Sequence, residues 1–379
     1  MDPAMKYELI KLHSNCEFSK WYRQSKNDKF ELCKVFCNLS KKYQIDYSKF
    51  SKMNFEELFA MQKYKLVGKL SCHLKMVTCI FVYDGKLYSG GNDNAIWVHD
   101  CETHNCIDIL CDDIGKGTVT CLTAYDGKLF SGYEDKTIKV WDCNEHKLII
   151  ILESESILVK PKYLLVYCGK LYSLYDDGVI KVWNCDDFTF NTTLDINNAS
   201  EENDEINHGM VGLFDDDEND ISMLSFNREI TCFTIEDGIL YLGNRRGRIK
   251  IWDCEKNILI KTTIVDSWKE IISITTANQK LYCSISNEIS VYDCSANYVP
   301  IMSVGPISSP HNYRDLTVHD GKLYCIYGES IMVRDCNDLG MIYTIHNGTH
   351  YTRNLCIHNN LIYSCSPFSS PGSIYMWKI

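Results

Sequence analysis

Short apolar runs, separated by tight turns, repeat along most of this chain. In one stretch, residues 119–125 (VTCLTAY) are mostly apolar or β-branched, which indicates a buried strand. Asp-Gly follows at 126–127 and predicts a hairpin, because a type I′ turn needs positive φ at both central residues. A second strand (KLFSG), a second turn (YEDK), a third strand at 138–142 and a fourth at 147–152 complete the unit. The pattern therefore predicts four short antiparallel strands.

This unit recurs at intervals of about 42 residues. An aromatic residue in the second strand marks seven copies: Tyr88, Phe130, Tyr172, Tyr241, Tyr282, Tyr324 and Tyr363. The end of the third strand marks the same seven: Asp100, Asp142, Asn184, Asp253, Asp293, Asp335 and Lys378. Because 69 residues separate Asn184 from Asp253, that interval contains an insertion. Seven four-stranded units predict an all-β fold, a seven-bladed β-propeller.

The third strands carry a family resemblance. IKVWD at 138–142 and IKIWD at 249–253 closely resemble the repeat ending of WD-repeat β-propellers, whereas IWVHD, ISVYD and IMVRD resemble it less closely. The resemblance covers residues 64–379 and implies a propeller that binds other proteins. The sequence of the repeats is also similar to that of WD-repeat proteins of giant DNA viruses and amoebae.

The Asp-His-Ser-Trp network that stabilises blades in this family is incomplete in every unit. The Gly-His pair of the family survives only as Cys72–His73, and Arg246 stands where the fourth unit should carry its turn aspartate. The other turn aspartates are Asp93, Asp135 and Asp177.

The seventh unit stops at Ile379, at the end of its third strand. Such an end leaves an unpaired sheet edge, which is an aggregation hazard. Residues 64–70 (YKLVGKL) precede the first unit and align with a fourth strand. We therefore expect residues 64–70 to close the ring as the outer strand of the last blade.

Residues 6–63 have a different pattern, which predicts a small N-terminal helical segment. Apolar residues follow helical spacing within 30–43 and 54–64. One interpretation is a helical cap packed on the propeller. The alternative is an adaptor segment, similar to those of ubiquitin-ligase substrate receptors, that links the propeller to a cullin-type ligase.

The same segment contains four potential zinc ligands, His13, Cys16, Cys33 and Cys37, at spacings that zinc tolerates. Cysteine pairs at such spacings also arise in any cysteine-rich helix, so the alternative is a helical core. Our prediction is that the protein has no metal and no other cofactor.

The 20 cysteines follow the repeat. One position, directly after the third strand, is shared by Cys101, Cys143, Cys185, Cys254, Cys294 and Cys336. Equivalent positions of neighbouring repeats are too far apart for a disulfide, whose Cα atoms lie about 5.5 Å apart. We expect buried, reduced thiols and therefore a reducing compartment, the cytoplasm or the nucleus.

Charge and motifs exclude several function classes. The net charge is −11, and no run rich in Lys or Arg occurs, which argues against nucleic acid as a ligand. No apolar stretch is long enough to span a membrane. The sequence contains no phosphate-binding glycine loop, G-x-S-x-G or H-E-x-x-H motif, which predicts a non-enzymatic protein.

The insertion at 195–227 holds ten acidic residues and no Lys or Arg, so the rest of the chain is nearly neutral. In WD-repeat propellers this connection lies on the face that also carries the turns between second and third strands, here called the top face. The insertion is interpreted as a solvated linker, a docking segment or a lid.

Top-face turns supply the candidate site. The fourth unit carries Arg245, Arg246 and Arg248, the densest positive cluster of the propeller. Further candidates for partner binding are Asn92, Tyr133, Tyr175, Tyr327 and Phe368. Aromatic residues on turns serve as interface anchors or as packing residues between blades, and both interpretations stay open.

The sequence thus predicts a scaffold that presents sites for proteins or peptides on a propeller face. One alternative is a substrate receptor, joined through the N-terminal helices to ubiquitin-ligase components. Another is a reader of acidic or phosphorylated motifs that uses the arginines of the fourth unit.

Overall fold

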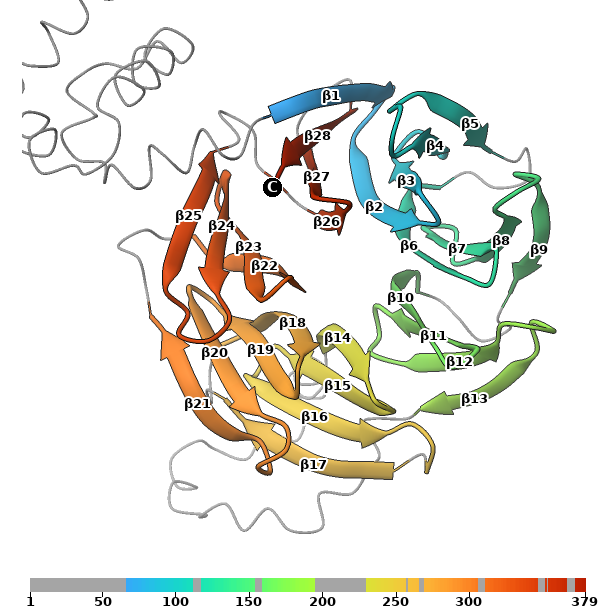
Figure 1. Ribbon diagram of the computed structural model, residues 1–379. Helices are drawn as coiled ribbons and strands as arrows, with labels where there is room; N and C mark the ends of the chain where they lie inside the picture. The colour runs from blue at the N-terminus through green and yellow to red at the C-terminus, as the bar shows by residue number, and fades with distance from the viewer. Residues whose placement is uncertain are drawn as a thin grey trace, which may run out of the picture.

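The computed structural model describes residues 66–379, except 112–116, 154–158, 195–229, 257, 266–268, 306–310, 347–351, 353 and 367–371. The described residues form seven four-stranded antiparallel sheets, the blades, around a common axis (Figure 1). This architecture confirms the predicted seven-bladed propeller. The predicted N-terminal helical segment lies outside the described residues.

Each blade runs from an inner strand at the axis to an outer strand at the rim (Figure 1). Blades 1–3 contain β2 (Val77–Tyr83), β3 (Lys86–Gly91), β4 (Ile96–Asp100) and β5 (Cys106–Leu110); β6 (Val119–Tyr125), β7 (Lys128–Tyr133), β8 (Ile138–Asp142) and β9 (Leu148–Leu152); β10 (Pro161–Tyr167), β11 (Lys170–Tyr175), β12 (Ile180–Asn184) and β13 (Phe190–Leu194).

Blades 4–6 contain β14 (Ile230–Glu236), β15 (Ile239–Asn244), β16 (Arg248–Asp253) and β17 (Ile258–Ile264); β18 (Ile271–Ala277), β19 (Lys280–Ile285), β20 (Glu288–Asp293) and β21 (Val299–Val304); β22 (Tyr313–His319), β23 (Lys322–Tyr327), β24 (Ser330–Asp335) and β25 (Met341–His346). Blade 7 combines β26 (Leu355–His358), β27 (Leu361–Ser366) and β28 (Gly372–Lys378) with β1 (Leu66–His73).

The first hairpin of each blade turns through two residues with positive φ, and in blades 1, 2, 4 and 6 these two residues are Asp-Gly. In blade 2, Asp126 and Gly127 have φ of 47° and 71°, as a type I′ turn requires. At the end of the third strand, Asp142 Oδ1 accepts the backbone N–H groups of Asn144 and Glu145, each at 2.7 Å. These bonds to the charged form lower the pKa of Asp142. The recurring aspartate therefore shapes the turn that leads into the fourth strand.

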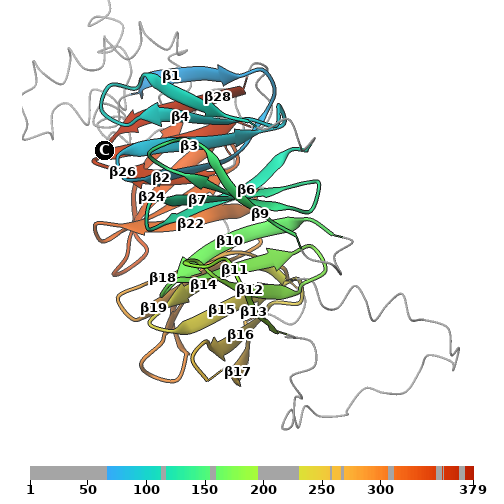
Figure 2. The same cartoon turned by 90° about the vertical axis from the view of Figure 1, so that its right-hand side faces the viewer.

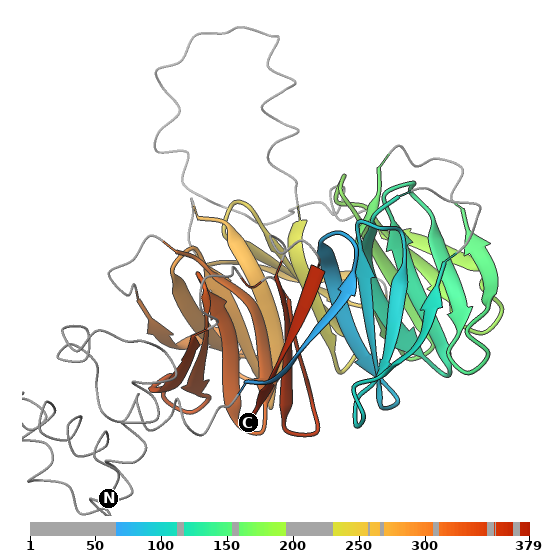
Figure 3. The same cartoon turned by 90° about the horizontal axis from the view of Figure 1, so that it is seen from above.

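The first described strand and the last strand of the chain pair with each other. β1 is antiparallel to β28, with a register from Leu66 opposite Trp377 to His73 opposite Gly372. Figure 3 shows the blue strand β1 crossing to lie beside the red strand. β1 therefore supplies the outer strand of blade 7, and its first five residues fall within the range expected for the closing strand.

The hydrophobic core lies between blades. One cluster combines Tyr88 and Val98 of blade 1 with Leu122 and Trp141 of blade 2, and the other clusters also join neighbouring blades. Every described cysteine is a free thiol. Burial raises the pKa of Cys121 to about 12, so this thiol packs as a hydrophobic residue.

A carboxylate links blades 6 and 7. Asp315 accepts a hydrogen bond from the backbone N–H of Leu355, and its φ is 50°. At the equivalent position of blade 5, Ser273 Oγ accepts the N–H of Leu316 at 2.9 Å. A neutral acceptor therefore suffices for this contact. Burial raises the pKa of Asp315 to about 7, although the bond from Leu355 opposes the shift.

We expect Asp315→Asn to stabilise the protein at pH 8 by about 1–3 kcal/mol and to change little at pH 4. The folded carboxyl keeps its proton up to about pH 7, whereas the unfolded one ionises near pH 4, so stability falls as pH rises between these values. Asn keeps the acceptor and tolerates positive φ. Urea unfolding of both proteins at the two pH values provides the measurement, and an equal difference at both would contradict the prediction.

Candidate functional site

The densest positive cluster lies on the turn between β15 and β16, residues Asn244–Arg248, here called the arginine turn. Asn244 Oδ1 accepts the backbone N–H groups of Arg246 at 3.0 Å and Arg248 at 2.9 Å. Gly247 adopts a φ of 67°, and its carbonyl accepts the N–H of Val265 at 2.8 Å. These bonds fix the backbone from which the three arginine side chains project.

The arginines differ in exposure. Arg245 and Arg246 are exposed, and Arg248 is half-buried. Arg245 Nε lies 3.6 Å from Glu270 Oε1, and both side chains are 47% exposed. Such an exposed pair contributes little to stability, so an anionic partner can compete for it. The repeat pattern does not predict Glu270, because this residue comes from the connection between blades 4 and 5.

The three candidate tyrosines lie in the core instead of on the surface. Tyr133, Tyr175 and Tyr327 are 1%, 2% and 5% exposed. Each is the last residue of a second strand, and its ring packs between two blades. Lys139 Nζ lies 4.1 Å from the centroid of the Tyr133 ring. Of the two interpretations, packing between blades therefore fits these residues, and they offer no exposed ring to a partner.

The remaining candidates are placed as follows. Asn92 is half-buried in the turn after β3, where its N–H donates to the Met76 carbonyl at 2.9 Å. Phe368, the acidic insertion at 195–227 and the potential zinc ligands lie outside the described residues. The same holds for residues 6–63, so the link to a ubiquitin ligase stays a prediction.

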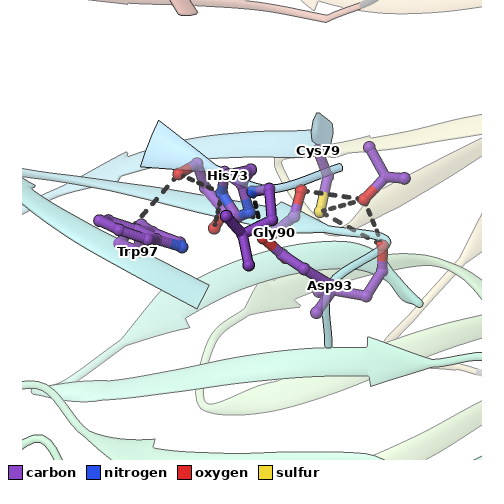
Figure 4. Close-up of polar contacts among 9 residues, drawn as sticks. His73, Cys79, Gly90, Asp93 and Trp97 are labelled. Carbon is purple, nitrogen blue, oxygen red and sulfur yellow. Dashed lines mark hydrogen bonds and ion pairs between the residues drawn. The ribbon is translucent and has the colours of Figure 1, made fainter. Parts of the chain in front are cut away.

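One cluster has the composition of a catalytic triad. His73 Nδ1 lies 2.8 Å from Asp93 Oδ1, and its Nε2 lies 2.9 Å from Ser89 Oγ (Figure 4). His73 and Ser89 are 0% exposed, so no substrate reaches the hydroxyl. The cluster instead ties the closing strand β1 to blade 1. Burial acts to raise the pKa of Asp93, but the bonds to His73 and to the backbone lower it overall.

This cluster matches three members of the network that the family resemblance implied. In blade 2 the fourth position of this network is Trp141, which lies opposite Leu129. In blade 1, His99 lies opposite Leu87 in the same way, so His99 holds the fourth position there. Burial lowers the pKa of His99 to about 4, so this ring is neutral at pH 7. The network is therefore incomplete in blade 1, as predicted, although His73 is fully bonded.

Across the described ranges, no group of three or more His, Cys, Asp or Glu side chains is arranged to hold a metal ion. Nor does this part of the chain include a helix that is long and apolar enough to cross a membrane.

Comparisons with known proteins agree with this geometry. The family model "WD domain, G-beta repeat" matches residues 64–100 and 105–142. No curated protein matches the chain in sequence. Among solved structures, the β-propeller domain of Cps50 (Swd1) from Myceliophteria thermophila is similar, with a TM-score of 0.65 and 12% identity over 83% of this chain and 99% of that domain. The computationally designed Ika8 protein is similar with a TM-score of 0.58 and 17% identity over 80% of this chain and 83% of that one.

The fold and the repeat unit define a seven-bladed β-propeller. Residues 64–100 and 105–142 match the WD-repeat family model, and all seven blades share the same four-stranded unit. WD-repeat propellers generally bind other proteins, and the chain's fold is consistent with that role.

Proposed function

We propose that this protein is a non-enzymatic scaffold that presents binding sites for other proteins on the top face. The closed ring holds the described turns between second and third strands in fixed relative positions, and such turns tolerate sequence change without loss of the blades. The observation that carries the proposal is the arginine turn, where exposed cations project from a backbone that Asn244 fixes.

A second candidate follows from the same turn. Arg245 and Arg246 are exposed beside each other, and Arg245 forms a weak, exposed ion pair with Glu270. Guanidinium groups bind carboxylates and phosphates with two parallel hydrogen bonds. The turn therefore suits an acidic or phosphorylated segment of a partner, and we propose it as the contact point for such a segment.

We expect Arg246→Glu to weaken binding of a ten-residue glutamate-rich peptide about three- to tenfold at low salt, because an exposed charge contributes on the order of 1 kcal/mol. Fluorescence anisotropy at 20 and 200 mM salt provides the measurement. Lys147→Glu is the matched control. Lys147 is 76% exposed and lies in blade 2 in the turn after β8, at the face opposite the top face. Equal losses in both variants would show nonspecific attraction and would contradict the proposal.

The scaffold proposal has its own test. Affinity capture from lysate with the wild type, Arg246→Glu and Lys147→Glu should recover one set of proteins that the first variant loses and the second keeps. If all three proteins recovered identical sets, the top face of blade 4 would not be a binding surface for these partners.

A further inference from the structure

The third residue of the inner strand distinguishes blade 3 from its neighbours. In blade 1 this residue is Cys79, which lies opposite Gly90 of the second strand. A methyl group on Gly90 would lie only 2.8 Å from Cys79 Sγ, so the buried thiol requires a glycine there. Blade 3 instead has Tyr163 opposite Leu174. Blades 2 and 4 repeat the cysteine–glycine pair as Cys121–Gly132 and Cys232–Gly243.

This exchange leaves an aromatic ring exposed near the axis. Leu174 is 0% exposed and packs in the cluster between blades 3 and 4, so its side chain occupies the space that a glycine leaves to the thiol in the other blades. Tyr163 is therefore 38% exposed, whereas Cys79 is 6% exposed. Because β10 is the inner strand of blade 3, the exposed ring belongs to the innermost layer of the propeller.

Phe233 and Lys162 flank this ring. The ring of Phe233, on β14 of blade 4, meets the Tyr163 ring edge-on, with centroids 6.2 Å apart and an interplanar angle of 72°. Lys162 Nζ lies 5.7 Å from the centroid of the Tyr163 ring. Tyr163 and Phe233 are here called the aromatic pair. The pair joins β10 to β14, which lie side by side in Figures 1 and 2.

Lys162 connects the aromatic pair to the arginine turn. Its Nζ donates to the carbonyl of Ile230, the first residue of β14, at 3.4 Å. Ile230 lies opposite Asn244, where the arginine turn begins. The aromatic pair, the ammonium group and the arginine turn therefore follow one another at the top end of blades 3 and 4. In blades 1, 2 and 4 a shorter threonine makes the contact between inner strands: Thr78, Thr120 and Thr231.

The charges of this region favour a protein segment over nucleic acid. The arginine turn and Lys162 supply cations for the carboxylates or phosphates of a partner. Carboxylates of the chain lie at the same end, since Glu134 Oε1 is 3.1 Å from Lys160 Nζ and Glu270 pairs with Arg245. A nucleic acid presents a phosphate at every nucleotide and would meet these carboxylates and a net charge of −11. A short acidic segment with one aromatic side chain suits the region better.

We propose that the aromatic pair binds an aromatic side chain of the same acidic or phosphorylated segment that contacts the arginine turn. The inference rests on the proposed contact at that turn and adds a second feature that the segment must carry. Edge-to-face contact with Tyr163 and the nearby Lys162 ammonium favour an aromatic side chain over an aliphatic one.

The test uses the full chain and two ten-residue glutamate-rich peptides that differ only in one central residue, phenylalanine or leucine. Fluorescence anisotropy at 20 mM salt measures both affinities. We expect the wild type to bind the phenylalanine peptide about three- to tenfold more tightly, because a ring pair contributes more than the burial of its area. Tyr163→Ser should remove this preference and leave the leucine peptide nearly unchanged.

Tyr125→Ser is the matched control. Tyr125 is 37% exposed and also lies on an inner strand, but it ends β6 at the opposite end of the propeller. This variant should keep the preference. Blade 5 carries Ser273 at the position of Tyr163, so the fold accommodates serine there. Should Tyr163→Ser still fail to fold, Phe233→Leu removes the other ring and should also reduce the preference.

The two proposals fail separately. Arg246→Glu should weaken both peptides equally; if it weakened neither while the preference stayed, the arginine turn would be refuted and the aromatic pair supported. Equal binding of the two peptides by the wild type, or an unchanged preference in Tyr163→Ser and Phe233→Leu, would overturn the inference. A ten-nucleotide oligothymidylate that binds the wild type but not Tyr163→Ser would assign the aromatic pair to nucleic acid and would also overturn it.

Discussion

A chain that begins at Leu74, and so lacks β1, is expected to aggregate instead of forming a soluble monomer. β1 pairs with β28 along its length, and six of the seven residues of β28 are buried. Removing β1 exposes this apolar strand and its unpaired backbone edge, which is a template for association with other chains. It also removes His73, whose ring bonds to Asp93 and Ser89 of blade 1.

The measurement is size-exclusion chromatography with light scattering on the truncated protein and on a control that begins at Tyr64. The control keeps β1 and should elute as a monomer with a cooperative thermal transition. A soluble, cooperatively folding protein that begins at Leu74 would show that three strands suffice for blade 7, and the prediction would be wrong.

Replacement of His73 by alanine is expected to lower the free energy of unfolding by about 3–5 kcal/mol. The ring is 0% exposed, and its loss leaves the Ser89 hydroxyl and the Asp93 carboxylate without their partner in a buried site. A buried polar group without a partner retains its full desolvation penalty. The closing strand would then hold blade 1 less tightly.

Urea unfolding at pH 7 measures this loss, with His104→Ala as the control. His104 is also a histidine of blade 1, but it is only half-buried. We expect the control to lose less than half as much stability. Asp93→Asn should remove a contribution of this carboxylate to the free energy of unfolding. The wild type has that contribution above about pH 4 and loses it as pH falls further, because the folded carboxyl has a lowered pKa. Equal losses in the two histidine variants would contradict a special role for His73.

The repeat made the blades predictable, because period-two strands and Asp-Gly turns are local signals. Side-chain direction at the ends of strands was less accessible. Tyr133 ends β7, and its ring packs in the cluster between blades 1 and 2, a contact that joins two repeats and that no single repeat contains. The same limit hid Glu270, whose contact with Arg245 joins two connections of different blades.

His73 was identified from its Cys-His pair, but Ser89 as its second partner required the three-dimensional arrangement.

The pairing of β1 with β28 has a consequence for synthesis of the protein. Leu66 pairs with Trp377, so β1 leaves the ribosome before roughly 300 further residues are translated. At about 5–20 residues per second, the strand waits on the order of 15–60 seconds for its partner. During that time the first six blades can assemble from local hairpins while both ends stay open. We therefore expect this chain to depend on chaperones during translation more than its compact final fold would indicate.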